Sequence, residues 1–185
     1  MIFHIYSAIG RTGSWRLCKL LSTSYQNYYP FANSFTDPAD EHFCHHVHSL
    51  DILPVPEAIP ILSTRKSRKD AALSNIIGGK QKEWVPQTQE KILNPFIADV
   101  NEYNNLIESM IEGERQFIEM YSPVIIYLED TVEDIEKKLN IQVPYPHIDK
   151  AYISKFPPNA YIENYSELPT QMPRSGASEY PRRDA

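Results

Sequence analysis

The sequence predicts a three-layer α/β fold whose sheet has four or five mostly parallel strands. Apolar runs of strand length occur at residues 2–7, 43–49, 59–64 and 124–128, and a fifth strand is expected near 29–33. Segments with helical apolar spacing follow at residues 15–21, 71–77, 94–121 and 131–139. Because strands that alternate with helices are joined by crossovers, this order favours a parallel sheet covered by helices on both faces.

The amino-acid composition limits the kinds of protein to which this chain can belong. The 185 residues are 42 % hydrophobic, which is typical of a globular chain with a substantial core. We expect one domain over residues 1–168 and a disordered tail over 169–185, which is rich in Pro, Ser, Gly and charge. The N-terminus has neither a basic region nor a long apolar run, so we expect no signal peptide and no membrane span. A soluble cytoplasmic protein with no membrane partner is the expectation, and the oligomeric state stays open.

The charge is unevenly distributed. A formal charge of −6 argues against a general nucleic-acid partner. Residues 1–80 carry 8 basic and 6 acidic side chains, a net charge of +2, whereas residues 81–185 carry 10 and 18, a net charge of −8. The positive half of the chain is therefore the half in which an anionic ligand is expected.

The first strand runs into a glycine-bearing loop, residues 7–14, that has the composition of a phosphate cradle. Glycine lets the backbone approach an anion, and the N–H groups of the loop and of the following helix can donate to it. Arg11 can add a charge-assisted hydrogen bond, and Thr12 and Ser14 supply hydroxyls. No Lys follows Gly13, so this is no Walker A loop, and it is not G-x-G-x-x-G. The alternative is an ordinary strand-to-helix turn that uses glycine for geometry alone.

Four histidines and a cysteine occur within the seven residues 42–48 and raise the hypothesis of zinc. A strand would place His45 on one face and His46 and His48 on the other. Structural zinc normally takes four ligands from two separated pairs. The sequence has no second Cys or His pair, so we expect no metal.

A second strand-to-helix turn is strongly basic. The apolar strand 59–64 is followed by Arg65-Lys66-Ser67-Arg68-Lys69-Asp70. Ser67 or Asp70 can cap the helix that follows, and Gly78-Gly79 is expected to end it. The carboxyl ends of strands in open α/β sheets are where ligands bind, so this turn is a second candidate anion site. The alternative is a solvated charge cluster.

The rest of the chain supplies scaffold elements. The polar segment 79–95 predicts a loop, and Asn94-Pro95 is expected to start a helix that runs to about Tyr121 with Gly113 as a weak point. After the strand at 124–128, Thr131 is expected to cap a helix together with Asp134, three residues later.

The two candidate anion turns resemble those of sulfotransferases that use 3'-phosphoadenylyl sulfate (PAPS), enzymes with a P-loop-like fold. The loop that carries the first resemblance is Gly10-Arg11-Thr12-Gly13-Ser14. It is similar to the family's loop for the 5'-phosphosulfate, in which a Lys or Arg, hydroxyls and a glycine follow the first strand. In the second turn Asp70 and Ser74 keep the family's four-residue spacing. In the family this Ser and an Arg hold the 3'-phosphate. Lys66 stands at the position of that Arg, and Arg65 lies one residue before it. Both are therefore candidates for the 3'-phosphate contact.

Three weaker similarities complete the resemblance. His48, on the segment 47–54, falls where cytosolic members have their catalytic base. Residues 127–130 resemble the family's Tyr-Glu-Asp-Leu segment, and residues 162–168 resemble a C-terminal segment of bacterial and carbohydrate sulfotransferases. The resemblance covers roughly residues 1–168 and is that of a short bacterial- or phage-type member.

The resemblance implies transfer of a sulfuryl group from PAPS to a hydroxyl or amine of a small-molecule or carbohydrate acceptor, without a metal. Arg11 would neutralise the leaving bridging oxygen, and His48 would accept the proton of the acceptor, with a carboxylate from elsewhere as the alternative base. Two other hypotheses stay open. One is a non-catalytic nucleotide-binding relative, and the other is a P-loop kinase-like phosphotransferase, which the missing Walker lysine disfavours.

Overall fold

The computed structural model describes residues 1–10, 12–22, 26–28, 32–35, 42–54, 56–81, 94–147 and 158–170. Its strands are β1 (Ile2–Tyr6), β2 (Gln26–Tyr28), β3 (Ala32–Phe35), β4 (Phe43–Val47), β5 (Ile59–Thr64) and β6 (Val124–Tyr127). Its helices are α1 (Ser14–Leu21), α2 (Arg68–Gln81), α3 (Val100–Tyr121) and α4 (Val132–Leu139), with the short 3-10 turns η2 (Pro158–Ala160) and η3 (Tyr165–Glu167). The predicted α/β class is confirmed.

The strands in the described part of the chain form one sheet in the order β2-β3-β4-β1-β5-β6. Strands β4, β1, β5 and β6 are all parallel, whereas β2 and β3 add an antiparallel pair at one edge. The mostly parallel sheet is as predicted, but its six strands exceed the four or five expected. The single strand expected near 29–33 was wrong: two short strands flank residues 29–31, which lie outside the described residues. Antiparallel neighbours need no crossover helix, so the alternation of strands and helices does not reveal them.

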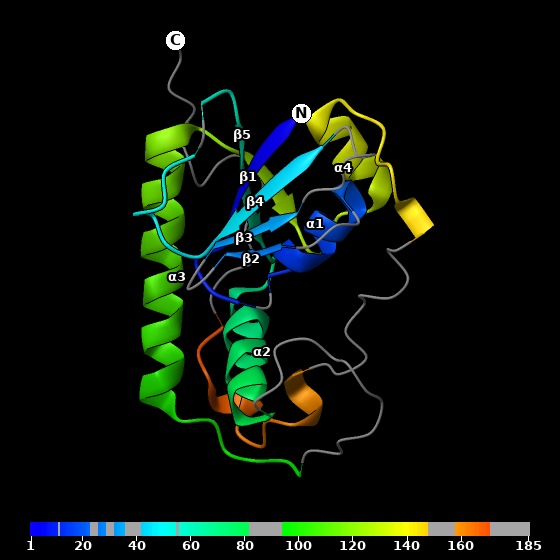
Figure 1. The fold of residues 1–185 in the computed structure, drawn as a ribbon. Helices are drawn as coiled ribbons and strands as arrows, with labels where there is room; N and C mark the ends of the chain where they lie inside the picture. The colour runs from blue at the N-terminus through cyan, green and yellow to red at the C-terminus, as the bar shows by residue number, and fades with distance from the viewer. Residues whose placement is uncertain are drawn as a thin grey trace.

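Helices cover both faces of the sheet. Figure 1 shows α1 and α4 on one face and α3 on the other, which makes three layers. Under α1 and α4 the core is largely aliphatic and includes Cys18 and Cys44, both fully buried and free. Burial beside Cys44 raises the pKa of the Cys18 thiol. On the other face Tyr6 and Leu62 pack against Phe117 of α3.

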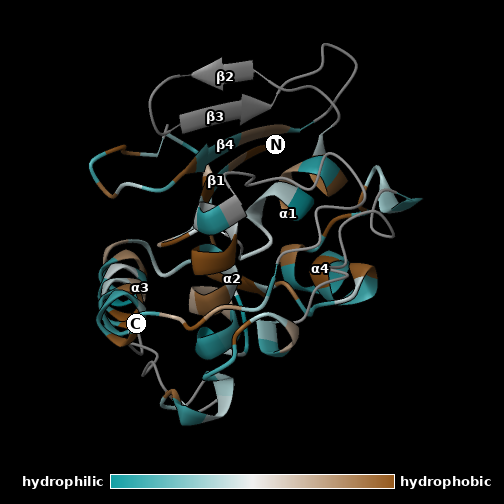
Figure 2. Ribbon diagram, turned by 90° about the horizontal axis from the view of Figure 1, so that it is seen from below, coloured by the Kyte–Doolittle hydropathy of each residue, from teal (hydrophilic) through white to brown (hydrophobic). Residues whose placement is uncertain are grey.

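A further apolar cluster lies beyond the carboxyl ends of the parallel strands. Figure 2 shows α2 there, between α3 on one side and α1 with α4 on the other. The cluster joins α2, the first half of α3, the loop after β1 and the C-terminal segment through Ile9, Leu73, Ile76, Tyr103, Ile107, Met110, Ile162 and Leu168. Both strand-to-helix turns therefore lie against this packed apolar cluster.

Two helix boundaries differ from those expected. Helix α2 does not end at Gly78-Gly79 but continues to Gln81, because Ile76 and Ile77 are buried on its inner face and packing outweighs the low helix propensity of glycine. Helix α3 begins at Val100 rather than at 94–95.

The start of α3 is set by a cap. Asp99 Oδ1 accepts hydrogen bonds from the N–H groups of Asn101 and Glu102, at 2.8 and 2.9 Å. These bonds satisfy the first donors of the helix. Upstream, Phe96 forms a parallel bridge with Ile162, so the chain before Asp99 is extended.

Helix α4 begins as predicted. Thr131 Oγ1 accepts from Asp134 N, and the Asp134 carboxylate accepts from Thr131 N, which makes a capping box. In the part of the chain that the structure describes, no helix combines the length and the apolar character needed to cross a membrane.

The C-terminal segment docks on the base of the molecule. Asn164 exchanges two hydrogen bonds with the backbone of Ala98. Tyr165 OH donates to Asp70 Oδ1 at 3.0 Å, and Lys69 Nζ donates to Leu168 O at 2.8 Å. The contacts of Tyr165 and Leu168 tie this segment to the first turn of α2, and those of Asn164 tie it to the chain before α3. The described part of this segment ends at Thr170. Residues 171–185, which belong to the predicted tail, lie outside the described residues.

At Gly113 the helix α3 closely approaches the end of β1. A Cβ there would lie 2.5 Å from Tyr6 OH and 3.1 Å from Ala8 Cβ, whereas a Cβ at Gly79 would meet nothing within 4 Å. We expect Gly113→Ala to lower the free energy of unfolding by about 1–3 kcal/mol through overpacking. Gly79→Ala should raise it by about 0.5–1 kcal/mol through helix propensity. Urea unfolding measures both.

Tyr6→Phe provides the control for Gly113→Ala, because it removes the hydroxyl that the new methyl group would meet. The penalty of Gly113→Ala should be smaller in the Tyr6→Phe background. An equal gain in stability from both alanines would show that α3 does not approach Tyr6 as described.

Candidate functional site

The loop after β1 leaves the carboxyl edge of the sheet and enters α1 through Gly13. Gly13 has φ 90°, and a Cβ there would lie 2.7 Å from Leu128 Cδ1, so both conformation and space require glycine. Leu17 N–H donates to Gly13 O at 3.0 Å, which closes the first turn of α1. The N–H groups of that turn have no partner within the helix and point toward the loop. Gly10 is partly exposed within the loop.

Four buried side chains with hydroxyl groups, those of Ser7, Thr12, Ser14 and Ser63, lie in or against this loop. Ser7 Oγ lies 3.4 Å from Ser14 Oγ, and Ser63 Oγ at the end of β5 donates to Thr12 O at 3.4 Å. Thr12 is buried, and its Oγ1 has no hydrogen-bond partner among the described residues. Arg11, the predicted charge of the loop, lies outside the described residues.

Arg16 fastens the loop to the segment after β6. It is 6 % exposed, and its Nη1 and Nη2 donate to Leu128 O and Asp130 O at 2.9 and 2.8 Å. Arg16 is not among the candidate residues of the sequence analysis. Its spacing in the sequence could have indicated that it is buried. Arg16 lies four residues before the buried Leu20 and therefore shares the inward face of the helix.

The turn after β5 brings Arg65, rather than Lys66, against Ser74. Arg65 Nη1 donates to Ser74 Oγ at 2.8 Å and to Asp70 O at 3.3 Å. The Lys66 side chain is exposed and lies 5.9 Å from the centre of the Tyr127 ring. Ser67 Oγ accepts from Asp70 N at 3.1 Å, so Ser67, one of the two residues expected to cap α2, fills that place. Arg65 and Ser74 thus form a preassembled donor pair.

Glu129 supplies the counter-charge of this turn. Its Oε1 lies 3.7 Å from Arg65 Nε, and its Oε2 accepts from Lys66 N at 3.0 Å. The Arg65 side chain is 12 % exposed and the Glu129 side chain 35 %, so the pair lies at the rim of the site. Glu129 thus pairs with the arginine at the end of the strand.

Beneath the turn lies a buried acid that sequence reasoning missed. Glu114 of α3 is 1 % exposed; it accepts from Thr64 Oγ1 and lies 3.6 Å from Arg68 Nε. It therefore links the last residue of β5 to the first residue of α2. Its signal in the sequence was a charged residue on the apolar stripe of a helix, one turn after Met110 and one turn before Phe117.

His48 closes the loop from the β4 side. Its Nδ1 lies 2.8 Å from Ser7 O and 3.0 Å from Ser7 Oγ. A carbonyl oxygen only accepts, so Nδ1 carries the proton and Nε2 carries the lone pair. Burial lowers the pKa of His48, and its hydrogen bond to Ser7 opposes that shift. The imidazole is therefore neutral at pH 7 and can accept a proton at Nε2.

The histidine-rich strand divides its side chains between the two faces of the sheet, as its alternation predicts. His46 is fully buried near Trp15 of α1 and His48, with its Nε2 3.4 Å from Ser7 Oγ. On the α3 face the Nδ1 atoms of His45 and His4 lie 3.2 Å apart. Among the described residues no three side chains of His, Cys, Asp or Glu converge as metal ligands would.

The candidate residues meet at one edge of the sheet. β1 pairs in parallel with β4 and with β5, so Ser7, His48 and Ser63 emerge side by side. Leu128 N–H donates to Thr64 O at 2.8 Å, and Leu128 also contacts Gly13, so the loop and the basic turn share a neighbour. The structure thus places the described residues of the glycine-bearing loop, Arg65, Ser74 and His48 at the carboxyl ends of neighbouring strands, and leaves Lys66 exposed.

Comparison with protein-family models, with curated proteins and with solved structures finds no match to this chain.

The histidine pair on the α3 face predicts a pH-dependent stability. Burial, and secondarily His45, lowers the pKa of His4 from 6.5 to about 4. Between these values the unfolded chain binds a proton that folded His4 does not, so the free energy of unfolding should fall as the pH falls from 6.5 toward 4. His4→Gln should make that loss shallower, whereas His147→Gln, at an exposed site, should leave it unchanged. Thermal melts between pH 4 and 7 measure this, and identical pH profiles for both variants would contradict it.

Proposed function

We propose that this chain transfers a sulfuryl group from PAPS to a hydroxyl or amine acceptor. The observation that carries the proposal is that the two candidate anion-binding turns follow the adjacent parallel strands β1 and β5. A single ligand with a phosphosulfate at one end and a 3'-phosphate at the other could contact both. The buried Thr12 Oγ1 supports this fit, because an anion oxygen in the loop would give that hydroxyl an acceptor.

The proposal assigns a binding role to residues of each of the two turns. The first N–H groups of α1 and the hydroxyls of Thr12 and Ser14 bind the 5' end of the donor. Arg65 and Ser74 bind the 3'-phosphate, for which Arg offers a bidentate fork and Lys a point charge. Arg11, outside the described residues, is the candidate for stabilising the leaving oxygen.

The chemistry is a substitution at sulfur. The donor supplies an activated sulfuryl group: its sulfur forms a bond to the acceptor oxygen or nitrogen, and the bond from sulfur to the bridging phosphate oxygen breaks. The products are the sulfated acceptor and adenosine 3',5'-bisphosphate, and His48 Nε2 takes the proton that the acceptor loses. Positioning and charge stabilisation do most of the work, so no metal is needed in the mechanism.

Calorimetry separates this proposal from the two others. Adenosine 3',5'-bisphosphate should bind, and ATP should bind much more weakly. Preferential binding of ATP would favour a kinase-like phosphotransferase. Transfer from ³⁵S-labelled PAPS to a panel of acceptors then distinguishes an enzyme from a nucleotide-binding relative without chemistry.

The 3'-phosphate contact can be assigned by matched variants. Arg65→Ala should weaken binding of adenosine 3',5'-bisphosphate by about 10- to 100-fold, as expected for a lost charged hydrogen bond. Binding of adenosine 5'-monophosphate, which has no 3'-phosphate, should not change. Lys66→Ala should change either affinity by less than about threefold, as expected for an exposed charge. A larger loss in Lys66→Ala than in Arg65→Ala would reassign the contact to Lys66.

The base can be tested by the pH dependence of turnover. Because burial lowers the pKa of His48, kcat/KM should fall only below pH 6.5 and should be flat above it. His48→Gln should lower kcat by about 10²- to 10⁴-fold and abolish that acid limb. His45 lies on the opposite face of the sheet, so His45→Gln should leave kcat unchanged and keep the fall of kcat/KM at low pH. A normal rate in His48→Gln would assign the base to another residue.

A further inference from the structure

A carboxylate from the segment after β6 contacts the basic turn. Glu129 Oε2 accepts from Lys66 N at 3.0 Å, and Glu129 Oε1 lies 3.7 Å from Arg65 Nε. A backbone N–H beside a guanidinium is a pair of donors suited to an oxyanion. The Glu129 carboxylate therefore occupies donors that a phosphate at this turn would use.

The contact between Arg65 and Glu129 is longer than a hydrogen bond. The distance of 3.7 Å is too long for one, and the buried Arg65 Nε has no hydrogen-bond partner among the described residues. By contrast, Arg65 Nη1 donates to Ser74 Oγ at 2.8 Å. A buried donor without a hydrogen bond is unfavourable, so an anion whose oxygen approaches Arg65 Nε more closely than Glu129 does would gain free energy.

The backbone of Glu129 is held on both sides, whereas its side chain reaches solvent. Arg16 donates to Leu128 O and to Asp130 O, at 2.9 and 2.8 Å. The Glu129 side chain is 35 % exposed, so it can rotate into solvent without displacing this backbone. Arg16 belongs to α1, which follows the glycine-bearing loop. The segment 128–130 therefore contacts both candidate anion turns.

Arg65 is the side chain for which an anion and Glu129 would compete. Arg68 Nε lies 3.6 Å from Glu114, and Lys69 Nζ donates to Leu168 O at 2.8 Å. These two cations of the basic turn are therefore paired with residues other than Glu129. Any loss of the Glu129 carboxylate should accordingly be felt through Arg65.

We propose that Glu129 is an internal competitor for the basic turn, which it closes to untethered anions and yields to a phosphate whose ligand the glycine-bearing loop also holds. This inference rests on the proposed function for the identity of that ligand, PAPS or adenosine 3',5'-bisphosphate. A phosphate tethered through the first loop is present at the turn at a high effective concentration, whereas inorganic phosphate is not. The tethered phosphate can therefore displace the carboxylate, and the untethered anion cannot.

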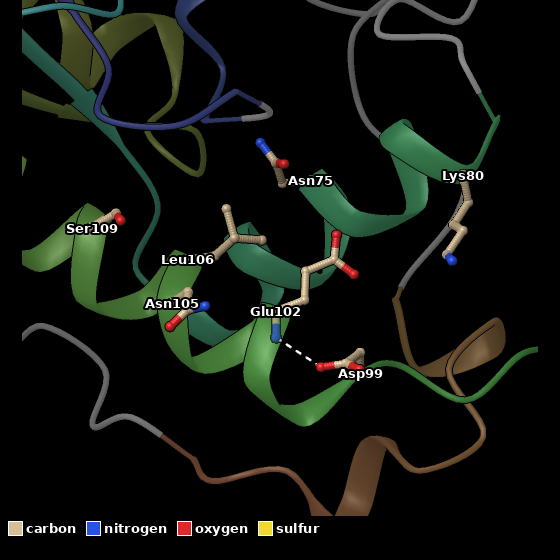
Figure 3. A pocket seen from close by; sticks show the side chains of 7 residues that line it. All are labelled: Asn75, Lys80, Asp99, Glu102, Asn105, Leu106 and Ser109. Atoms are coloured by element: carbon tan, nitrogen blue, oxygen red, sulfur yellow. Dashed lines mark hydrogen bonds between the residues drawn. The ribbon is translucent and has the colours of Figure 1, made fainter.

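The hollow between α2 and α3 is a poor site for the same anion. Figure 3 shows this hollow, which has a volume of about 630 Å³ and is lined by Asn75, Lys80, Asp99, Glu102, Asn105, Leu106 and Ser109. Most of these residues are exposed, and among them two carboxylates outnumber one ammonium group. An anionic probe is therefore expected at the basic turn.

Calorimetry on Glu129→Gln tests the competition. Glutamine keeps an oxygen that can accept from Lys66 N but lacks the charge that pairs with Arg65. The variant should bind adenosine 3',5'-bisphosphate about tenfold more tightly than the unchanged protein, because no carboxylate has to be displaced. Its affinity for adenosine 5'-monophosphate, which has no 3'-phosphate, should change by less than about twofold.

Two matched variants control for a general effect of charge. Glu133→Gln removes a carboxylate at an exposed position of α4 and should alter neither affinity by more than about twofold. In an Arg65→Ala background, Glu129→Gln should no longer strengthen binding of the bisphosphate, because the group for which the two ligands compete is gone. An equal gain in Glu133→Gln, or a full gain without Arg65, would contradict the inference.

Inorganic phosphate tests the inference without a nucleotide. It is titrated into the ¹⁵N-labelled full chain, and the Arg65 Nε–H resonance is followed by NMR. Glu129→Gln should lower the phosphate concentration at half-saturation about tenfold. Weaker or unchanged binding in Glu129→Gln would overturn the inference, because the carboxylate would then brace Arg65 rather than compete for it. If the bisphosphate does not bind but Glu129→Gln still strengthens phosphate binding, the proposed function fails and the competition stands.

Discussion

The parallel pairing of β1 with its neighbours is the constraint on which the site depends. The registers Tyr6↔Val47 and Tyr6↔Leu62 end β1 and β4 at one level, and β5 ends two residues further along, at Thr64. The loop before α1, the segment that begins at His48 and the turn before α2 therefore leave the sheet together. A slip of one residue in either pairing would turn the inward side chains of a strand to the other face. The hydrogen bonds of Ser7 and Ser63 across this edge would then be lost.

Segments distant in sequence hold the cations of this edge in place. Arg16 is bound by carbonyls that follow β6, Arg65 faces Glu129 of the same segment, and Arg68 faces Glu114 of α3. Buried or partly buried arginine requires such partners, because an unpaired charge away from water is strongly unfavourable. These contacts position the three arginine side chains in advance, which reduces the entropy that they would lose on binding a ligand.

Local patterns predicted the elements but not every boundary. The alternation of the histidine strand correctly separated His45 from His46, and Thr131 with Asp134 correctly marked the start of α4. Gly78-Gly79 failed as a stop signal because the burial of Ile77 continues the helix. The start of α3 was misplaced because pairing of Phe96 with a segment 66 residues later competes with helix formation, and no local pattern reports such a partner.

By itself, the sequence determined the α/β class, the glycine-bearing loop, the basic turn and the faces of the main strands. These follow from period, capping and composition, which are properties of neighbouring residues. Only the tertiary structure decided that Arg65 rather than Lys66 meets Ser74, that Glu114 lies beneath the turn, and that a polar hollow opens between α2 and α3. Each depends on the orientation of side chains from separate elements across the sheet edge, and packing rather than spacing fixes that orientation.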